Sequence, residues 1–316
     1  MSWKQMPTVD NREGVRTVAV DRDRDGQRVD NFLSANLKGV PKSAVYRLIR
    51  TGQVRVNGKR CKASTRLAEN DRVRIPPVRL QQRDEVIVSD AVQEQVRQAV
   101  VFENEHLLII DKPSGMAVHS GSGLPWGLID ALRQSRPGEF LELVHRLDRE
   151  TSGCLVLARN GKALNHLSAQ FREGTPGKFY FCLLDGRLQQ DMVEVDAPLA
   201  KGENGQRRQV QVTAAGKEAQ TRFRRLEAYT AGTLAEAELL TGRTHQVRVH
   251  AQHLGTPLAG DALYSSRKSL NKWRKLGLRR LFLHAHRVVL QDPGGGELDI
   301  SSPLPDTLRR VLDGLE

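Results

Sequence analysis

The sequence reads His145-Arg146-Leu147-Asp148-Arg149-Glu150-Thr151-Ser152-Gly153 between two short apolar runs, 141–144 and 154–158. The runs predict buried strands, so the polar stretch between them is expected to be a loop held by a sheet. Loops on rigid scaffolds often carry catalytic groups, and the candidate here is Asp148, which lies between two arginines. The closing Thr-Ser-Gly predicts a tight turn. On spacing alone, an ordinary ion-paired surface loop is the favoured interpretation.

A second polar stretch follows a predicted strand that ends at Leu240. It reads Thr241-Gly242-Arg243-Thr244-His245-Gln246-Val247-Arg248. Gly242 permits a turn, Thr244 is the expected N-cap, and a helix is predicted over 244–254. Arg243 therefore lies at a strand-to-helix junction, where its side chain can point either into a cleft or toward solvent.

Two residues between these stretches are expected on one face of a strand. Side chains alternate along a strand, so Lys178 and Tyr180 in Lys178-Phe179-Tyr180-Phe181 lie on the same side. Tyr180 is then either a core residue or an aromatic platform for a base.

The region 100–316 contains more strand-like than helical patterns. Strands are predicted near 107–110, 155–158, 179–184, 221–223, 233–240 and 281–283, and helices near 128–134, 162–171, 244–254 and 306–312. The two kinds do not alternate strictly, which favours a mixed, mainly antiparallel α+β domain over a doubly wound sheet.

A smaller domain is predicted at 18–78, after a flexible tail at 1–17 and before an interdomain linker at 79–99. Amphipathic helices are expected over 28–37 and 42–50, the second with Val45, Leu48 and Ile49 on one face. Asn57-Gly58 predicts a hairpin.

Positive charge dominates this smaller domain. No acidic residue occurs between Asp30 and Glu69. Such a window favours contact with nucleic-acid phosphates. The basic residues expected to make it are Lys42, Arg47, Arg50, Arg55, Lys59 and Arg60.

The whole chain of 316 residues has a formal net charge of +12. This surplus favours a polyanionic partner, nucleic acid more than an anionic membrane surface. Residues 262–291, which contain no acid, are expected to form a second phosphate-binding surface. No run approaches the roughly 20 apolar residues of a membrane span, and no secretory signal is visible, so a cytoplasmic location is expected. The three cysteines form no C-x-x-C pair and the histidines lack a convergent third ligand, so no metal site is predicted.

Five motifs, in order, resemble those of the RluA family of pseudouridine synthases. They are Asp111-Lys112-Pro113-Ser114-Gly115-Met116-Ala117-Val118-His119, His-Arg-Leu-Asp-x-x-Thr-Ser-Gly from His145, Lys-x-Tyr from Lys178, Thr-Gly-Arg-x-His-Gln-x-Arg from Thr241, and Leu281-Phe282-Leu283-His284-Ala285. The resemblance implies that Asp148 is the catalytic carboxylate of a uridine isomerase that needs no cofactor. Asp148 would either attack covalently or abstract a ribose proton. The resemblance also implies that Arg243 pairs with Asp148, that Tyr180 stacks on the uracil and that Arg146 fills the space left by the extruded base.

The smaller domain resembles the S4 RNA-binding domain. The match runs through Gly26-Gln27-Arg28-Val29-Asp30, residues 52–59 and Asp71-Arg72-Val73-Arg74-Ile75. Together with Gly39-Val40-Pro41-Lys42-Ser43, 74–79 and 121–124, it resembles the family's ribosomal large subunit pseudouridine synthase C branch, which implies 23S ribosomal RNA as the substrate. Transfer RNA, or a non-catalytic RNA-binding role, is the alternative, although the intact motifs argue against the latter. No heptad pattern or extra apolar face is visible, which favours a monomer.

Overall fold

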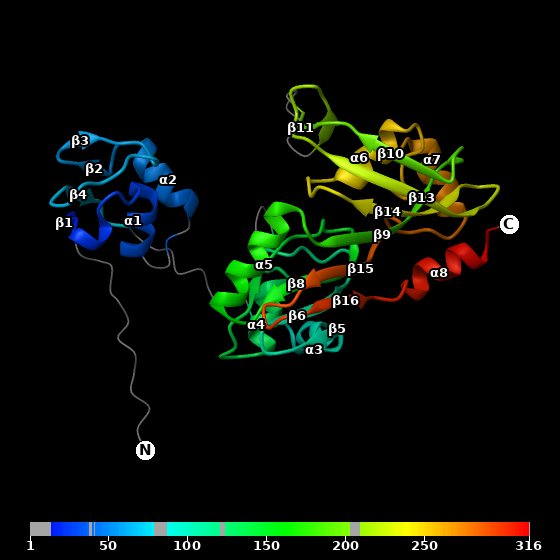
Figure 1. The fold of residues 1–316 in the computed structure, drawn as a ribbon, viewed down its shortest axis with the longest axis horizontal. Helices are drawn as coiled ribbons and strands as arrows, with labels where there is room; N and C mark the ends of the chain where they lie inside the picture. The colour runs from blue at the N-terminus through cyan, green and yellow to red at the C-terminus, as the bar shows by residue number, and fades with distance from the viewer. Residues whose placement is uncertain are drawn as a thin grey trace, which may run out of the picture. The chain divides into compact units, whose positions relative to one another are not determined.

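The computed structural model describes residues 14–37, 40, 42–78, 87–120, 124–202 and 209–315, apart from the side chains of Asp23, Lys42 and Ser43. The chain forms two compact units, 1–85 and 86–316 (Figure 1). Most of the predicted tail, 1–13, lies outside the described residues. Its last two residues, Arg16 and Thr17, instead begin the first strand, β1 (Arg16–Ala19).

The N-terminal unit combines two helices with a small antiparallel sheet. Its elements are β1, the short 3-10 helix η1 (Arg22–Arg24), α1 (Val29–Asn36), α2 (Lys42–Arg50), β2 (Arg55–Val56), β3 (Lys59–Arg60) and β4 (Arg72–Ile75). The strand order is β1-β4-β2-β3. The apolar face predicted for the second helix is confirmed, because Val45, Leu48 and Ile49 are buried in a core shared with Phe32 and Val73.

The predicted hairpin is also confirmed. Asn57 and Gly58 connect β2 to β3 with φ angles of 49° and 77°. Two consecutive positive φ angles match a type I′ turn, which Asn-Gly accommodates with little strain. The Asn57 side chain then donates to Asp71 and accepts from the Arg72 backbone N–H, so the hairpin is tied to β4.

A ten-stranded sheet forms the centre of the second unit. The strand order is β10-β13-β14-β9-β15-β8-β6-β5, with β16 beside β15 and β7 beside β8. The strands are β5 (Val100–Glu103), β6 (Leu107–Lys112), β7 (Glu142–Leu143), β8 (Ser152–Ala158), β9 (Gly177–Leu184), β10 (Met192–Asp196), β13 (Gln220–Ala228), β14 (Thr233–Leu239), β15 (Leu283–Gln291) and β16 (Glu297–Ser301). Every pairing is antiparallel except that of β15 with β8, which confirms the mixed, mainly antiparallel α+β class. A separate two-stranded ribbon joins β11 (Leu199–Lys201) to β12 (Val210–Val212).

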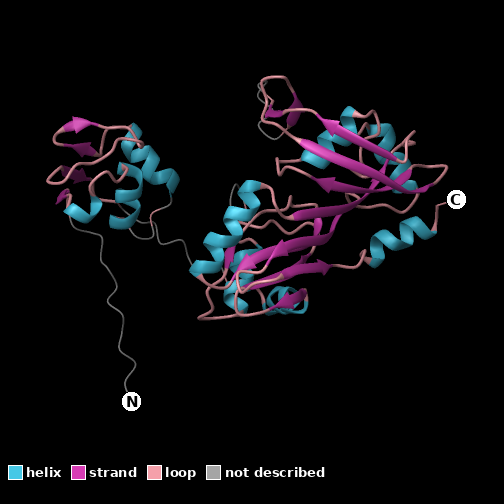
Figure 2. Ribbon diagram, in the orientation of Figure 1, coloured by secondary structure: helices cyan, strands magenta, loops and turns pink. Residues whose placement is uncertain are grey.

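Helices pack on the sheet, as Figure 2 shows. They are α3 (Asp90–Gln98), α4 (Leu128–Ser135), α5 (Gly161–Glu173), α6 (Gln246–His253), α7 (Arg267–Lys275) and α8 (Asp306–Asp313). Alternation along β6 divides the core between the two faces. Leu108 and Ile110 pack in a cluster with α4, whereas Leu107 and Ile109 pack in a second cluster with α5. None of the helices in the described ranges is long and apolar enough to cross a membrane.

Three local predictions differ from the structure. Residues 90–98, assigned to the linker, form helix α3, because Val92 and Val96, four residues apart, reach the main core from an otherwise polar sequence. The strand predicted at 281–283 begins at Leu283 and runs to Gln291. Helix α7 occupies the basic stretch after Tyr264, where no element was predicted.

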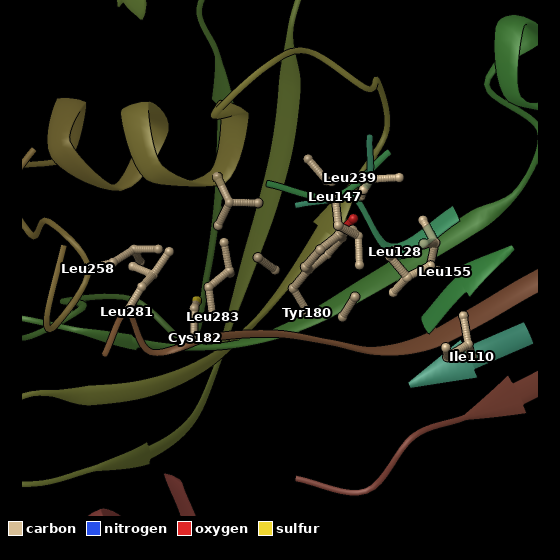
Figure 3. Close-up of a cluster of buried hydrophobic side chains, with 14 of the residues drawn as sticks. Ile110, Leu128, Leu147, Leu155, Tyr180, Cys182, Leu239, Leu258, Leu281 and Leu283 are labelled. Atoms are coloured by element: carbon tan, nitrogen blue, oxygen red, sulfur yellow. The ribbon is translucent and has the colours of Figure 1, made fainter. Parts of the chain in front are cut away.

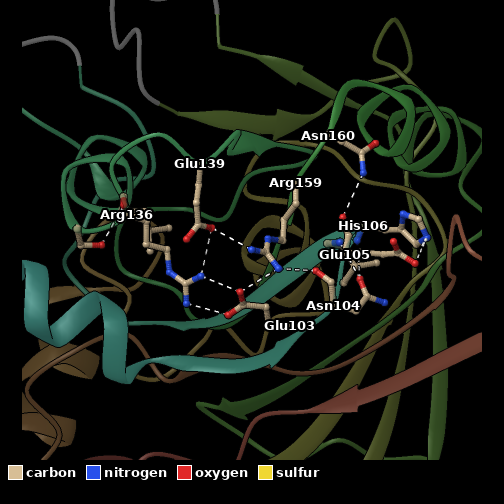
Figure 4. Close-up of polar contacts among 11 residues, drawn as sticks. Glu103, Asn104, Glu105, His106, Arg136, Glu139, Arg159 and Asn160 are labelled. Carbon is tan, nitrogen blue, oxygen red and sulfur yellow. Dashed lines mark hydrogen bonds and ion pairs between the residues drawn. The ribbon is translucent and has the colours of Figure 1, made fainter. Parts of the chain in front are cut away.

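A network of partly exposed ion pairs lies at the end of β8 (Figure 4). Both nitrogens of the Arg136 fork lie 2.8 Å from the Glu103 carboxylate. Arg159, just beyond β8, lies 2.9 Å from the same carboxylate and 3.1 Å from Glu139. Charges shared among several partners resist solvent screening better than an isolated surface pair. The network therefore joins β5, the end of α4 and the strand that follows the Asp148 loop.

Candidate active site

The loop that carries Asp148 runs from β7 to β8 and is anchored in the core. Leu147 is 5% exposed and packs with Tyr180, Leu239 and Leu283 (Figure 3). Asp148, the next residue, retains 17% exposure of its side chain. A buried neighbour therefore fixes the carboxylate at the edge of the core, where it remains accessible.

A buried lysine fastens the other side of the loop. Lys112, at the end of β6, is 0% exposed, and its Nζ donates to the carbonyl oxygens of Pro113 (2.8 Å), Met116 (2.8 Å) and Arg149 (3.1 Å). Burial lowers the pKa of Lys112 to about 7. Three acceptors around Nζ match the three donors of the ammonium form. These bonds tie the residue after Asp148 to the turn that follows β6.

The end of the motif does not form the predicted tight turn; Ser152 and Gly153 instead open strand β8. Gly153 has a φ of 110°, and a Cβ at this position would lie 2.2 Å from the carbonyl oxygen of Ala285. Ala285 belongs to β15, the one parallel neighbour of β8 in this sheet. Glycine satisfies both the backbone angle and the close approach of the two strands.

Ser152 connects this loop to β15 through a chain of hydrogen bonds. Arg280 Nη2 donates to Ser152 Oγ at 2.7 Å, and Ser152 Oγ lies 2.9 Å from His284 Nδ1. His284 Nε2 lies 3.1 Å from the carbonyl oxygen of Ser302, so these partners assign the proton to Nε2. Burial lowers the pKa of His284 to about 4, which keeps the ring neutral near pH 7.

Asp148 shares one arginine with a second, fully buried carboxylate. Arg248 Nη1 lies 3.4 Å from Asp148 Oδ2. Its Nε and Nη2 donate to the two oxygens of Asp261 at 2.7 and 2.8 Å. Burial alone opposes the charge of Arg248, but the hydrogen bonds and charge of Asp261 more than offset this, so the pKa of Arg248 is raised. Asp261, which is 0% exposed, therefore holds the guanidinium in place beside Asp148.

The expected pairing of Arg243 with Asp148 is wrong. The Arg243 side chain is exposed, and its Nε donates to the carbonyl oxygen of Glu218 at 2.9 Å. Arg248 takes the place predicted for Arg243 because it lies one turn into α6, on the buried side of the helix. Arg243 stays at the strand-to-helix junction and lines the rim of the cavity that contains Asp148.

His245 approaches Asp148 from the start of α6. Its Nε2 lies 3.7 Å from Asp148 Oδ2, and its Nδ1 lies 2.8 Å from the Tyr264 hydroxyl. Burial lowers the pKa of His245 even though the charge of Asp148 opposes the shift. His245, rather than the predicted Thr244, is the N-cap, with a left-handed φ of 57° that directs its ring toward the site.

Two cavities meet at Asp148. One, of about 730 Å³, extends past Arg248 to the residues around α7, including Arg274, Arg279 and Arg280. The other, of about 380 Å³, extends between α5, β9 and the turn before α6. Arg146 and Asp148 line both. Among the described residues, no group of three or more His, Cys, Asp or Glu side chains could hold a metal ion.

Comparison with known proteins assigns this architecture to a family. The RNA pseudouridylate synthase model matches residues 106–253 and the S4 domain model matches 27–73. A Vibrio parahaemolyticus protein named ribosomal large subunit pseudouridine synthase C is 47% identical over 309 residues, which cover 96% of this chain and 98% of the relative. The chain belongs to the RNA pseudouridylate synthase family.

Further relatives agree along almost the whole length. An Escherichia coli K12 protein, also named ribosomal large subunit pseudouridine synthase C, is 46% identical over 95% of this chain and 97% of its own. The solved structure of human RNA pseudouridylate synthase domain containing 4 is 25% identical with a TM-score of 0.60, and the match covers 72% of this chain and 97% of that one. The resemblance inferred from the motifs, to this family and to its large-subunit branch, is thereby confirmed.

In this pseudouridylate synthase, the ring of Tyr180 is less accessible for stacking on a base than predicted. The residue is 8% exposed and packs in the core with Leu147 and Leu239. Burial raises the pKa of Tyr180, so its hydroxyl stays protonated. Lys178 and Tyr180 are both buried on the same face of β9, as the strand alternation predicts. A stacked base can therefore reach only a small part of the Tyr180 ring.

The S4 domain of this pseudouridylate synthase exposes most of the predicted RNA-binding residues. Arg47 and Arg50 extend from α2, whereas Arg55, Lys59 and Arg60 lie on the hairpin, and all five are exposed. None of the five forms an ion pair with another residue in the described ranges. The side chain of Lys42 lies outside the described residues.

Two functional residues, Arg248 and Asp261, were not predicted from the sequence. Arg248 occupies a second arginine position of the same motif, between Val247 and Val249, which are 3% and 2% exposed. A charged residue flanked by buried apolar ones was the available signal, since buried charges require partners. Asp261 carried a weaker signal as the last acid before the acid-free stretch.

Proposed function

We propose that the chain isomerises specific uridines of 23S ribosomal RNA to pseudouridine, with Asp148 as the catalytic carboxylate. The observation that carries the proposal is the environment of Asp148: a core-anchored carboxylate, 17% exposed, beside Arg248 at the junction of two cavities rich in arginine. The relatives are named for the ribosomal large subunit, and the S4 domain adds a basic surface suited to RNA. The proposed active form is a monomer in the cytoplasm.

The chemistry needs only what these residues supply. The N-glycosidic bond breaks, the base turns, and a bond forms from the ribose to C5, whose hydrogen leaves as a proton while N1 gains one. A carboxylate beside the ribose can start this sequence by attack on C1′ or by removal of the C2′ proton. Arg248 compensates the negative charge of Asp148, and the two side chains are 8% and 17% exposed. Bonds made and broken balance within the nucleotide, so no cofactor is consumed.

The target base must first leave its stack, at a cost of a few kcal/mol. Arg146 is the proposed wedge that fills the vacated space. It is exposed and lines both cavities, and its side chain has no hydrogen-bond or ion-pair partner among the described residues. A planar guanidinium can stack on the neighbouring bases while it meets phosphate. Tyr180 would contact the uracil through the accessible part of its ring.

The decisive experiment compares wild type, Asp148→Asn and Glu150→Gln on 23S ribosomal RNA and on transfer RNA, with pseudouridines mapped after each incubation. Glu150 is the matched control, because it lies on the same loop and its carboxylate forms a 3.8 Å ion pair with Arg149 rather than with Arg248. We expect Asp148→Asn to form no product while it binds RNA as tightly as wild type. Glu150→Gln should modify the same uridines as wild type.

Two outcomes would count against the proposal. Equal product formation by wild type and Asp148→Asn would remove Asp148 from catalysis. Modification of transfer RNA with 23S RNA unchanged, in vitro and in cells with and without this chain, would reject the proposed substrate.

A further inference from the structure

Lys178 is a buried lysine without a partner in the described part of the chain. It is 8% exposed, and its Nζ neither donates a hydrogen bond nor joins an ion pair with any described residue. This contrasts with Lys112, whose ammonium group is surrounded by three carbonyl oxygens. An unpaired buried charge is costly, so such a lysine is expected to have a ligand when the protein functions.

The 380 Å³ cavity that Lys178 lines is strongly cationic. We call it the Lys178 cavity. Its charged lining comprises Arg146, Arg172, Lys178 and Arg243 against a single acid, Asp148. Arg172 extends from α5 on one side and Arg243 from the turn before α6 on the other, and neither pairs with an acidic side chain in the described ranges. Four cationic side chains around one carboxylate leave a surplus of positive charge, which suits the binding of an anion.

Aromatic, apolar and hydroxyl-bearing residues form the rest of this cavity. The ring of His145 stacks on Phe171 with centroids 4.4 Å apart and an interplanar angle of 9°. His145 Nε2 accepts from the Val156 backbone N–H, and burial lowers its pKa to about 3, so the ring adds no charge. The cavity therefore combines a neutral stacked wall with cations, a combination that fits a nucleotide with its phosphate.

We propose that the Lys178 cavity binds one backbone phosphodiester of the RNA, the one next to the extruded uridine, with Lys178 and Arg172 as the phosphate ligands. The inference rests on the proposed function, because it takes the ribose of the target to lie at Asp148. Lys178 and Asp148 line the same cavity, so a phosphate at Lys178 belongs to the target nucleotide or its immediate neighbour.

A phosphate satisfies the cavity better than the uracil does. The base is neutral and would leave the charge of Lys178 uncompensated. A phosphodiester supplies a full negative charge and several acceptor oxygens, which suit both an ammonium and a guanidinium fork. Burial lowers the pKa of Lys178 in the free protein, and a bound anion would oppose that shift.

The test pairs single-phosphate changes in the RNA with single changes in the protein. The RNA is a 23S fragment around a target uridine, with each nearby phosphate replaced in turn by an uncharged methylphosphonate. The proteins are wild type, Lys178→Met, Lys178→Arg, Arg172→Gln and the control Lys162→Met. Lys162 is an exposed lysine on the same helix as Arg172 and does not line the cavity. Both Kd and the kcat and KM of product formation are measured.

We expect one methylphosphonate to weaken wild-type binding and raise KM by about 10-fold or more, since a charge-assisted hydrogen bond contributes roughly 1.5–3 kcal/mol. The same change should have little further effect in Lys178→Met, because the partner is already gone. Lys178→Arg should restore part of the loss, and Lys162→Met should behave as wild type. Arg172→Gln, an exposed change that does not threaten folding, should show the same non-additivity at the same phosphate.

Additive effects at every phosphate position, or wild-type Kd and KM in Lys178→Met, would overturn the inference. Displacement of the RNA by inorganic phosphate at low millimolar concentration, with no positional effect of methylphosphonate, would also overturn it in favour of a free-anion site. The Kd measurements do not depend on product formation, so they test the phosphate site independently of catalysis. A wild type that binds with this positional pattern but forms no pseudouridine would refute the proposed function and leave the phosphate site intact.

Discussion

Asp261→Asn is expected to lower both stability and kcat, because it releases Arg248. The carboxylate of Asp261 is 0% exposed and the Arg248 side chain 8% exposed. Opposite charges about 4 Å apart interact by roughly 4 kcal/mol at an effective dielectric constant near 20. Removing one member of a buried pair costs about 3–5 kcal/mol. Asp148, 3.4 Å from Nη1, still compensates part of the charge, so we expect the free energy of unfolding to fall by about 3 kcal/mol, the lower end of this range.

The kinetic effect follows from the freed guanidinium. Once released from Asp261, Arg248 is expected to turn toward Asp148 and draw its carboxylate away from the ribose. A displacement of about 1 Å at a reacting group can cost about 100-fold in rate, so kcat should fall by about that factor while KM changes little. Tritium release from RNA containing 5-tritiated uridine measures the rate, because the new bond at C5 displaces that hydrogen. Urea unfolding followed by tryptophan fluorescence measures the stability.

A matched control separates burial from pairing. Asp299 also holds an arginine through two hydrogen bonds, with Arg287 Nε at 2.7 Å and Nη2 at 2.6 Å, but its side chain is 47% exposed. Asp299→Asn should therefore cost no more than about 1 kcal/mol and leave kcat unchanged. Wild-type kcat in folded Asp261→Asn would refute the reasoning, since Arg248 would then be positioned without its buried partner.

Two further substitutions test the strand contact and the buried histidine. Gly153→Ala should lower the free energy of unfolding by about 3 kcal/mol or more, because its Cβ would lie 2.2 Å from the carbonyl oxygen of Ala285. The control Gly138→Ala, at a position with a φ of 85° and open space around it, should lower it by about 1 kcal/mol. Urea unfolding measures both, and equal losses would show that the close approach of β15 is unimportant. His284 has a folded pKa of about 4, below its ordinary value of 6.5, so its contribution to stability is lost as pH falls from 6.5 toward 4. His284→Gln should flatten that slope by at most about 1.4 kcal/mol per pH unit, and an identical slope in the two proteins would contradict the assignment.

Local patterns predicted the parts of the fold that depend on local physics. The apolar face of α2 followed from helical spacing, and the β2–β3 hairpin followed from Asn57-Gly58, whose backbone angles need no tertiary support. Alternation placed Lys178 and Tyr180 on one face of β9. The Asp148 loop was expected between two strands, and it is found between β7 and β8.

Contacts between distant segments could not be predicted in the same way. Thr-Ser-Gly locally predicts a turn at Gly153, yet the deciding neighbour is Ala285, which lies 132 residues later in the chain. Helix α3 was missed because its core contact comes from only two valines in a polar sequence. The choice between Arg243 and Arg248 depended on which side of α6 faces the core. It also depended on Asp261, a partner that the motif does not contain.

Arg248 contacts two carboxylates, and the difference between the two contacts explains why Asp148 is suited to chemistry and Asp261 is not. Asp261 accepts from Arg248 through both oxygens at 2.7 and 2.8 Å, and its Oδ1 also accepts from the backbone N–H groups of Leu263 and Tyr264. Asp148 Oδ2 lies 3.4 Å from the remaining nitrogen, Arg248 Nη1, and the carboxylate lines the cavities. A carboxylate that accepts two short hydrogen bonds from a guanidinium group has few lone pairs left to attack a ribose carbon or remove a ribose proton. The buried acid thus orients the charge of Arg248, and the longer contact leaves Asp148 compensated yet free to react.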